Sequence, residues 1–410
     1  MRELFSYRSF RNLWVSSLLA TLGGSAFPIA LAVVVLDAGG DASTLGLILG
    51  ARVLSSVLFT LIGGVWADRL PRKYVLIGSD VTRAFLVLIL VFISANNVPE
   101  IILGLLVFLM GIGDAFAGPA SGAILPGILP DHMLPQGNVA RGIVLRIGNI
   151  VGPGLGGVGV AFFGGQKTFL ITFVTYVIAA SILLRVVEKP LLNPSLRPSF
   201  ISELREGLVT VWRIPWVAAC IAMATFQLMV VLGTSEVLLP VIARREFGRD
   251  YAFATGFAAF SLAGMISSLI AIRFKAKHPG LISVTVWGFF AVAPLTLAFP
   301  ISENFVIAGY FIAGLSLGPW EAYWSTAIQR EIPQELQGRV FSIDYMGSVG
   351  LMPIGMAMAG PVTELFGEQR FLIGAAIFHI VVCAIVLMVP GVKDLRMPTK
   401  NYSEGEQSKS

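Results

Sequence analysis

The sequence is poor in charge, cysteine and histidine. Only 13% of its 410 residues are charged, whereas soluble domains carry roughly 25%. Its 2 cysteines lie in apolar runs and give no disulfide framework. Its 3 histidines, His132, His278 and His379, are too scattered along the chain to predict a metal site. A soluble domain and a disulfide-based scaffold are therefore excluded.

Motifs for nucleotide hydrolysis and covalent catalysis are also missing. The chain has no Gly-Lys-Ser/Thr phosphate loop and no Gly-x-Ser-x-Gly elbow. It has no soluble domain that would hold ATP. We therefore expect neither an enzyme nor a cofactor, and any energy source must be an ion gradient rather than ATP.

Long apolar runs take the place of these features. The chain is 56% hydrophobic with a mean hydropathy of +0.82, and a membrane helix needs about 20 mostly apolar residues. The sequence therefore predicts an all-α membrane protein with 12 spans in two pseudo-symmetric six-helix bundles. The expected spans are 12–37, 43–67, 74–96, 99–127, 135–164, 168–187, 216–243, 251–273, 281–300, 304–329, 338–366 and 370–390.

The basic residues set the orientation. Most of the 29 Lys and Arg residues fall on the segments that share a side with the two chain ends, and positive charge marks the cytoplasmic side. Both termini are therefore expected in the cytoplasm, and the first span is interpreted as a retained helix rather than a signal peptide. This bias explains the net charge of +5 and gives no support for nucleic-acid binding.

The chain divides into two halves around a polar stretch. We expect an amino-terminal bundle at 1–187, a cytoplasmic linker at 188–215, a carboxy-terminal bundle at 216–392 and a disordered tail at 393–410. The linker contains an amphipathic helix over Phe200–Trp212. The basic loop after span two recurs after span eight, at Arg273 and Lys277. Internal repeats of this kind place a substrate site between the halves in many transporters.

The loop after span two combines small, acidic and basic residues. Glycine permits close helix contact, and an aspartate can meet a helix N-terminus or a nearby arginine. Such a contact predicts a latch that holds one conformation closed, whereas the alternative is an ordinary positive-inside loop. The expected latch residues are Gly64, Asp68, Arg69, Arg72 and Lys73.

Span five carries a run of glycines around a proline. The proline removes a backbone hydrogen bond and the glycines allow a bend and tight packing. The alternative is simple packing, because small residues are frequent in membrane helices. The residues are Gly148, Gly152, Pro153, Gly156 and Gly157.

Charges inside the spans are the best pointers to function. A charge at the membrane centre costs about 2.5–3.5 kcal/mol on insertion scales. We therefore expect a carboxylate to couple transport to protons, with an arginine as its partner, although a register-fixing ion pair is the alternative. The residues are Asp114, Glu236, Glu321, Arg52 and Arg146, while Asp80 and Arg83 are expected to pair with each other.

Aromatic side chains accompany these charges. Such residues suit a pocket for a bulky, lipophilic substrate, and they suit core or lipid-facing packing equally. The predicted cavity residues are Phe116, Phe226, Gln227, Trp320, Tyr323 and Trp324.

The loop motif resembles that of the major facilitator superfamily of secondary transporters, with Pro71 where the family usually has glycine. The Gly-Pro run resembles the motif of its proton-coupled antiporters, with Val139 in place of an upstream glycine. Three segments resemble the bacterial efflux branch that includes macrolide efflux proteins and the enterobactin exporter: Phe10–Trp14, Ser79–Ala84, and Trp320-Glu321 followed by Gln329–Pro333. Span four carries Asp114 instead of the motif arginine of better-known multidrug antiporters, so their arginine-based proton relay does not carry over.

The resemblance implies a monomeric inner-membrane carrier that exports a hydrophobic or amphipathic small molecule in exchange for protons, by alternating access. Two other functions stay open from the residues alone. One is nutrient uptake or facilitated diffusion, which predicts a polar cavity. The other is a membrane scaffold or lipid-handling protein that moves no solute.

Overall fold

The computed structural model describes residues 3–93, 99–189, 200–248, 251–271, 273–274 and 276–396. Every regular element in these residues is helical, which confirms the predicted all-α class. The first part contains η1 (Leu4–Ser6), α1 (Arg8–Asp37), α2 (Ala42–Arg69), α3 (Arg72–Ile93), α4 (Glu100–Ala123), η2 (Leu125–Gly127), η3 (Asp131–Met133) and α5 (Leu134–Leu183). The connecting helix is α6 (Phe200–Arg213).

The second part is more broken. It contains α7 (Pro215–Gln227), the π-helical turn η4 (Leu228–Gly233), α8 (Thr234–Phe247), α9 (Tyr251–Ala271), α10 (Pro279–Trp287), η5 (Gly288–Ala291), α11 (Val292–Ala298), α12 (Glu303–Gly314), α13 (Leu317–Glu331), α14 (Gln334–Gly350), α15 (Met352–Phe366) and α16 (Glu368–Val386). Local chemistry sets several ends. Asp41 accepts a hydrogen bond from the Thr44 backbone N–H as the N-cap of α2. Gly248 ends α8 in the left-handed conformation.

Eleven helical segments of the described residues are long and apolar enough to cross a membrane. One of them, Asp131–Leu183, is 53 residues long and contains both predicted spans 135–164 and 168–187. Gly164 interrupts it with φ 78°, a conformation that favours glycine. Beyond Gly164 the chain returns, because residues from both arms pack on α1: Gly148 meets Thr21, and Thr175 meets Gly23. The eleven segments therefore provide the twelve predicted crossings.

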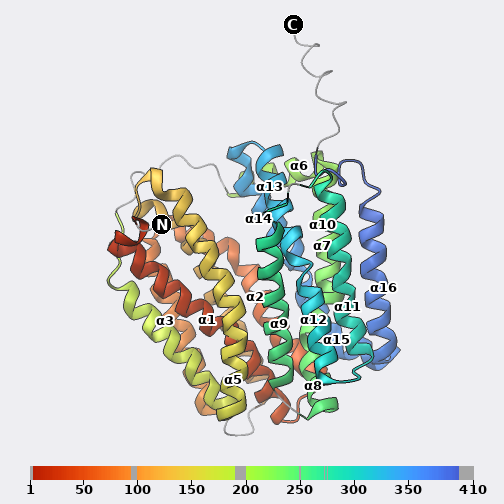
Figure 1. Cartoon of the computed structure of the whole chain (residues 1–410). Helices are drawn as coiled ribbons and strands as arrows, with labels where there is room; N and C mark the ends of the chain where they lie inside the picture. The colour runs from red at the N-terminus through yellow and green to blue at the C-terminus, as the bar shows by residue number, and fades with distance from the viewer. Residues whose placement is uncertain are drawn as a thin grey trace.

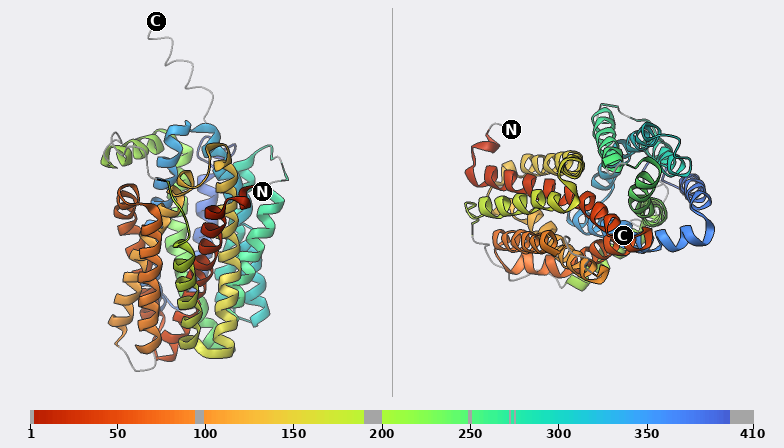
Figure 2. Two further views of the ribbon diagram at one scale, coloured as in Figure 1. Left: turned by 90° about the vertical axis from the view of Figure 1, so that its left-hand side faces the viewer. Right: turned by 90° about the horizontal axis from the view of Figure 1, so that it is seen from below.

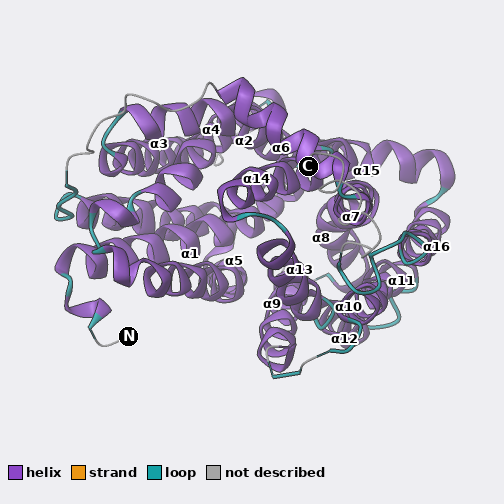
Figure 3. Ribbon diagram, turned by 90° about the horizontal axis from the view of Figure 1, so that it is seen from above, coloured by secondary structure: helices purple, strands orange, loops and turns teal. Residues whose placement is uncertain are grey.

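The helices form two bundles that lie side by side (Figure 1). One contains α1 to α5 and the other α7 to α16, and α14 lies between them when the molecule is seen from above (Figure 3). We call the end that carries Arg69, Arg72, Arg330 and Arg339 the basic end, and the opposite end the far end. The described chain also ends at the basic end, where the Leu395 carbonyl accepts a hydrogen bond from Arg330.

The bundles meet closely at the far end. A Cβ atom on Gly46 of α2 would lie 2.0 Å from the backbone oxygen of Met356 in α15. A Cβ atom on Gly157 of α5 would lie 2.5 Å from Ala254 Cβ in α9. Toward the basic end, Gly64 and Gly118 face open space. The bundles therefore close at the far end and separate at the basic end. Seen from below, the two bundles lie next to each other (Figure 2).

The connecting helix α6 belongs to the second bundle in space. Glu206 pairs with Arg339 of α14, and Gly207 packs on Arg339 and Ile343. The helix covers the predicted amphipathic segment Phe200–Trp212 and ends one residue later. Of the expected linker 188–215 and tail 393–410, residues 190–199 and 397–410 lie outside the described residues.

Candidate functional site

Four charged side chains of the first bundle form one continuous set of ion pairs. Arg83 of α3 contacts Asp80 at 2.5 Å and Asp114 of α4 at 2.9 Å. The second oxygen of Asp114 accepts from Arg52 of α2, also at 2.9 Å. We call Asp80, Arg83, Asp114 and Arg52 the charge chain. It is formally neutral, and the predicted Asp80–Arg83 pair is confirmed.

Aromatic rings support both arginines of the charge chain. Arg83 lies over the ring of Tyr176, 4.6 Å from its centroid, and Arg52 lies over Phe27 at 5.2 Å. A cation over an aromatic face is stabilised by the ring quadrupole. Asp80 and Arg83 are only 3% and 7% exposed. Paired and supported in this way, the charges are tolerated inside the apolar bundle.

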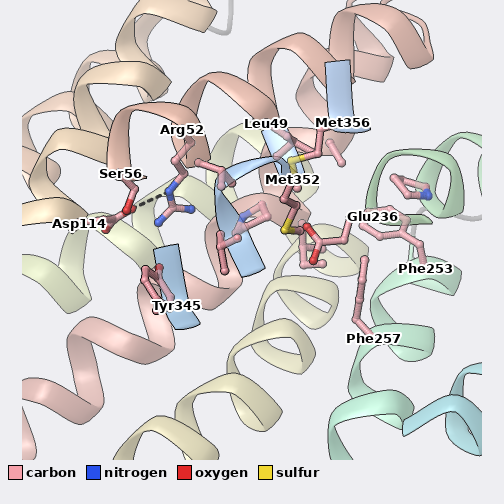
Figure 4. A pocket seen from close by; sticks show the side chains of 16 residues that line it. Leu49, Arg52, Ser56, Asp114, Glu236, Phe253, Phe257, Tyr345, Met352 and Met356 are labelled. Atoms are coloured by element: carbon pink, nitrogen blue, oxygen red, sulfur yellow. Dashed lines mark hydrogen bonds and ion pairs between the residues drawn. The ribbon is translucent and has the colours of Figure 1, made fainter. Parts of the chain in front are cut away.

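Asp114 also lines three neighbouring cavities, which we call lobes, two of them between the bundles and one within the first bundle. The deep lobe, about 300 Å³, contains Arg52, Asp114, Glu236, Phe257, Tyr345 and Met352 (Figure 4). The side lobe, about 330 Å³, lies within the first bundle and contains Ser17, Thr21, Asp80, Arg83, Ser121 and Arg141. The vestibule, about 620 Å³, opens toward the basic end and contains Gly64, Gly118, Arg141, Arg339, Phe341 and Met346.

Glu236 is the one charged residue that the second bundle contributes to the deep lobe. It lies in the first turn of α8, directly after the π-helical turn η4, and such turns occur frequently at functional sites. Among the described residues it makes no ion pair or hydrogen bond, and apolar side chains such as Phe253 and Phe257 surround it (Figure 4). Arg52 and Asp114 lie on the opposite side of the lobe. The deep lobe therefore has one carboxylate without a counter-charge.

The described latch residues have different surroundings. Gly64 lines the vestibule and Arg69 is exposed. Arg72 is buried and pairs with Glu188 at 3.7 Å, while the Lys73 ammonium donates to the Leu184 carbonyl. The side chain of Asp68 is outside the described part of the structure, as is that of Arg146.

The predicted glycine run of α5 faces α1 and α9. Gly148, Gly152 and Gly156 approach Thr21, Ser25 and Ala26 of α1. Pro153 lies inside the helix, and Gly157 reaches Ala254 of the other bundle. The run therefore packs α5 tightly within its own bundle and brings it against the second one.

The predicted cavity residues pack elsewhere in the two bundles. None of Phe116, Phe226, Gln227, Trp320, Tyr323 and Trp324 lines the three lobes. Trp320 and Trp324 are parallel at 5.6 Å and continue a stack with Trp287. Gln227 is buried and accepts a hydrogen bond from Trp287 at 2.7 Å.

The remaining predicted aromatics also line none of the three lobes. Phe116 packs edge-on against Trp66, Phe226 is 48% exposed, and Tyr323 donates to the Phe274 carbonyl. These side chains pack between helices or face outward. A cluster of large rings fills a helix bundle as readily as it lines a pocket, so the aromatic composition alone does not distinguish the two. Glu321, which was expected to be a buried charge, is exposed on α13 and lines none of the three lobes.

Sequence reasoning missed three polar residues that the structure brings forward. Arg141 lines two lobes, but at the end of a span it is indistinguishable from a positive-inside arginine. Tyr176 supports Arg83, and Glu188 accepts from the backbone N–H groups of Arg72 and Lys73. No cluster of His, Cys, Asp and Glu that would hold a metal ion occurs among the described residues.

Comparisons with known proteins agree on one family. The sequence profile described as the Major Facilitator Superfamily matches residues 13–356. The multidrug efflux pump Tap of Mycolicibacterium fortuitum is 25% identical over 94% of this chain and 96% of its own. Macrolide efflux protein A of Streptococcus pyogenes is 24% identical with the same coverage. The crystal structure of a mutant of the nucleoside transporter NupG superposes with a TM-score of 0.75 at 13% identity, over 92% of this chain and 99% of its own.

Proposed function

The chain belongs to the major facilitator superfamily of membrane transporters, and on that basis we propose that it exports a hydrophobic or amphipathic small molecule in exchange for protons. Two relatives that match almost its whole length are named as multidrug and macrolide efflux proteins. At 24–25% identity their names support outward transport and a lipophilic class of substrate.

The distribution of basic residues supports the orientation that export requires. Positive charge marks the cytoplasmic side of a membrane protein, so we assign the basic end to the cytoplasm of a bacterial cell and the far end to the outside. The vestibule then opens to the cytoplasm. A single chain contributes both bundles and all three lobes, so we propose a monomer as the working unit.

The observation that carries the proposal is the carboxylate of Glu236 in the deep lobe. It has no partner among the described residues and faces a cavity that separates the two bundles. A carrier that exchanges substrate for protons needs a carboxylate that meets solvent from each side in turn. We assign this role to Glu236, with Asp114 as the second carboxylate of the same lobe.

The exchange follows from alternating access. In the state open to the cytoplasm, Glu236 releases its proton and the substrate enters through the vestibule. Rocking of the bundles then closes the basic end and opens the far end, where the substrate leaves and Glu236 takes up a proton. One charge crossing 100 mV supplies about 2.3 kcal/mol, which is sufficient to bias such a cycle.

We also propose roles in this cycle for two of the predicted motifs. Asp68 and the basic residues of its loop would latch the basic end when it closes, since the vestibule beside Gly64 must then disappear. The glycine run of α5 would form the packing surface on which the far end closes, because Gly157 lies against Ala254 of the second bundle.

Transport by purified protein in proteoliposomes tests the proposal. An imposed pH gradient should drive accumulation of lipophilic dyes or macrolides. Glu236→Gln should abolish gradient-driven accumulation while Glu364→Gln, an exposed carboxylate on α15, transports normally. Movement that ignores the gradient would contradict proton exchange, and the absence of movement for every compound would contradict export of this class.

A further inference from the structure

The side lobe contains an arginine, Arg141, that has no ionic partner in the described part of the chain. Arg141 of α5 lines both the side lobe and the vestibule. Among the described residues it makes no ion pair, and its Nε atom is buried without a hydrogen-bond acceptor. An unpaired buried donor costs free energy comparable to a lost hydrogen bond. The site therefore lacks an acceptor that a ligand would supply.

The other charges of the side lobe are already balanced. Asp80 and Asp114 lie in the charge chain, where Arg83 and Arg52 hold them. The carboxylate oxygens are therefore already paired with arginines. The net charge of the lobe is +1, which equals the charge of Arg141. A neutral or cationic group gains nothing from this arrangement, whereas an anion gains a direct partner.

Two hydroxyl groups add to the same lobe. Ser17 of α1 and Ser121 of α4 line it, and neither side-chain hydroxyl makes a hydrogen bond within the described part of the chain. Other hydroxyls of the lobe are satisfied internally, since Ser16 donates to the Ala179 carbonyl and Thr21 to the Ser17 carbonyl. Ser17, Ser121 and Arg141 are therefore free donors that line one cavity.

We propose that the side lobe binds the anionic group, such as a carboxylate, of an amphipathic substrate, with Arg141 as its ion-pair partner and Ser17 and Ser121 as hydrogen-bond donors. The apolar body of the substrate then occupies the vestibule, where Phe341, Ile343 and Met346 lie. Arg141 lines both spaces, so one molecule reaches both. This inference rests on the proposed export function and narrows its substrate class to lipophilic acids and zwitterions.

Two dyes that differ in a single group test the proposal. Rhodamine 19 carries a free carboxyl group, and rhodamine 6G is its ethyl ester. Binding to wild-type protein in nanodiscs is measured by fluorescence anisotropy, and the acid should bind more tightly than the ester. Arg141→Gln should weaken binding of the acid about tenfold, the size of one charge-assisted hydrogen bond, and should leave the ester within about twofold.

Three further variants distinguish loss of the anion site from a general loss of folding. Arg141→Lys should retain most of the preference for the acid. Ser17→Ala should weaken binding of the acid several-fold and leave binding of the ester unchanged. Arg185→Gln, which removes an exposed arginine outside the lobes, should leave the binding of both dyes unchanged. Equal weakening of both dyes by Arg141→Gln, or no binding of either dye to wild-type protein, would overturn the proposal.

The outcome separates this site from the transport function. Export of rhodamine 6G in proteoliposomes, with no preference for the acid and no effect of Arg141→Gln, would overturn the anion site and leave export standing. Binding of the acid that depends on Arg141, without gradient-driven transport of either dye, would support the site and contradict the proposed function.

Discussion

Asp37, the last residue of α1, forms an ion pair with Arg244 of α8, 207 residues away along the chain. The pair joins the two bundles at the far end, beside the close approach of α2 and α15. The next arginine, Arg245, pairs instead with Glu368 of α16, inside the second bundle. Neighbouring arginines thus make one contact between the bundles and one within a bundle.

The Asp37–Arg244 pair should favour the state that is closed at the far end. Arg244→Gln should shift the population toward far-end opening by up to about fivefold, because a largely exposed ion pair contributes roughly 0.2–1 kcal/mol. Spin labels at the exposed positions Ala38→Cys, after α1, and Leu365→Cys, on α15, in a background in which Cys220 and Cys383 are replaced, report the separation.

The neighbouring pair supplies the control for this prediction. Arg245→Gln should leave the label distance unchanged, because Arg245 and Glu368 belong to the same bundle. The charge exchange Asp37→Arg with Arg244→Asp should restore the closed population. Equal shifts from Arg244→Gln and Arg245→Gln would show that general loss of positive charge, rather than the inter-bundle pair, controls the far end.

The charge chain should behave as one energetic unit. Asp114→Asn leaves Arg52 without its carboxylate and Arg83 with only Asp80, so it should destabilise the protein by roughly 1.5–3 kcal/mol, the value for hydrogen bonds to charged groups. Adding Arg52→Gln should recover part of this loss, with a coupling free energy of about 0.5–3 kcal/mol. Thermal unfolding in detergent measures each variant.

The exposed variant Glu364→Gln is the control for the charge chain and should unfold at the wild-type temperature. Strict additivity of Asp114→Asn and Arg52→Gln would show that the 2.9 Å contact between these side chains carries no net free energy.

The sequence was informative wherever a property belongs to one helix. Apolar length predicted the spans, and i,i+3 spacing predicted the Asp80–Arg83 pair. The insertion cost of buried charge singled out Arg52, Asp114 and Glu236, which the structure brings to one lobe. It failed for Glu321, because a charge inside a long apolar run is not necessarily on a buried face.

Contacts between side chains on different helices could not be predicted from the sequence. Arg141 and Glu188 look like ordinary residues at span ends, and their roles depend on side chains that face them from other helices. The tryptophans show the same limit, because ring stacking inside a bundle and the lining of a pocket demand the same composition. The turn at Gly164 was anticipated as a break between spans, whereas the structure places a single left-handed glycine there.

The close contact at Gly46 should be needed for the conformation that is closed at the far end. Gly46→Ala places a methyl group 2.0 Å from the Met356 oxygen across the bundles, so the far end must move apart and the separation of the spin labels should increase. Gly64→Ala meets open space in the same helix α2 and should leave the distance and the thermal stability unchanged. A stable, closed far end in Gly46→Ala would contradict the tight contact between α2 and α15.

The carboxylate of Glu188 should hold the start of α3 in place. Its two oxygens accept from the backbone N–H groups of Arg72 and Lys73 at 3.3 and 3.0 Å, the position in which an anion satisfies free N–H groups and the helix dipole. Glu188→Ala should destabilise the protein by about 1–2 kcal/mol, a typical cost for loss of a helix cap.

Glu188→Gln distinguishes the cap from the charge. It retains an oxygen for the N–H groups but loses the ion pair with Arg72, so it should fall between wild type and Glu188→Ala in thermal unfolding. Glu364→Ala, an exposed residue, should match wild type. If Glu188→Gln unfolds at the same temperature as Glu188→Ala, charge balance with Arg72 outweighs the hydrogen bonds to the helix start.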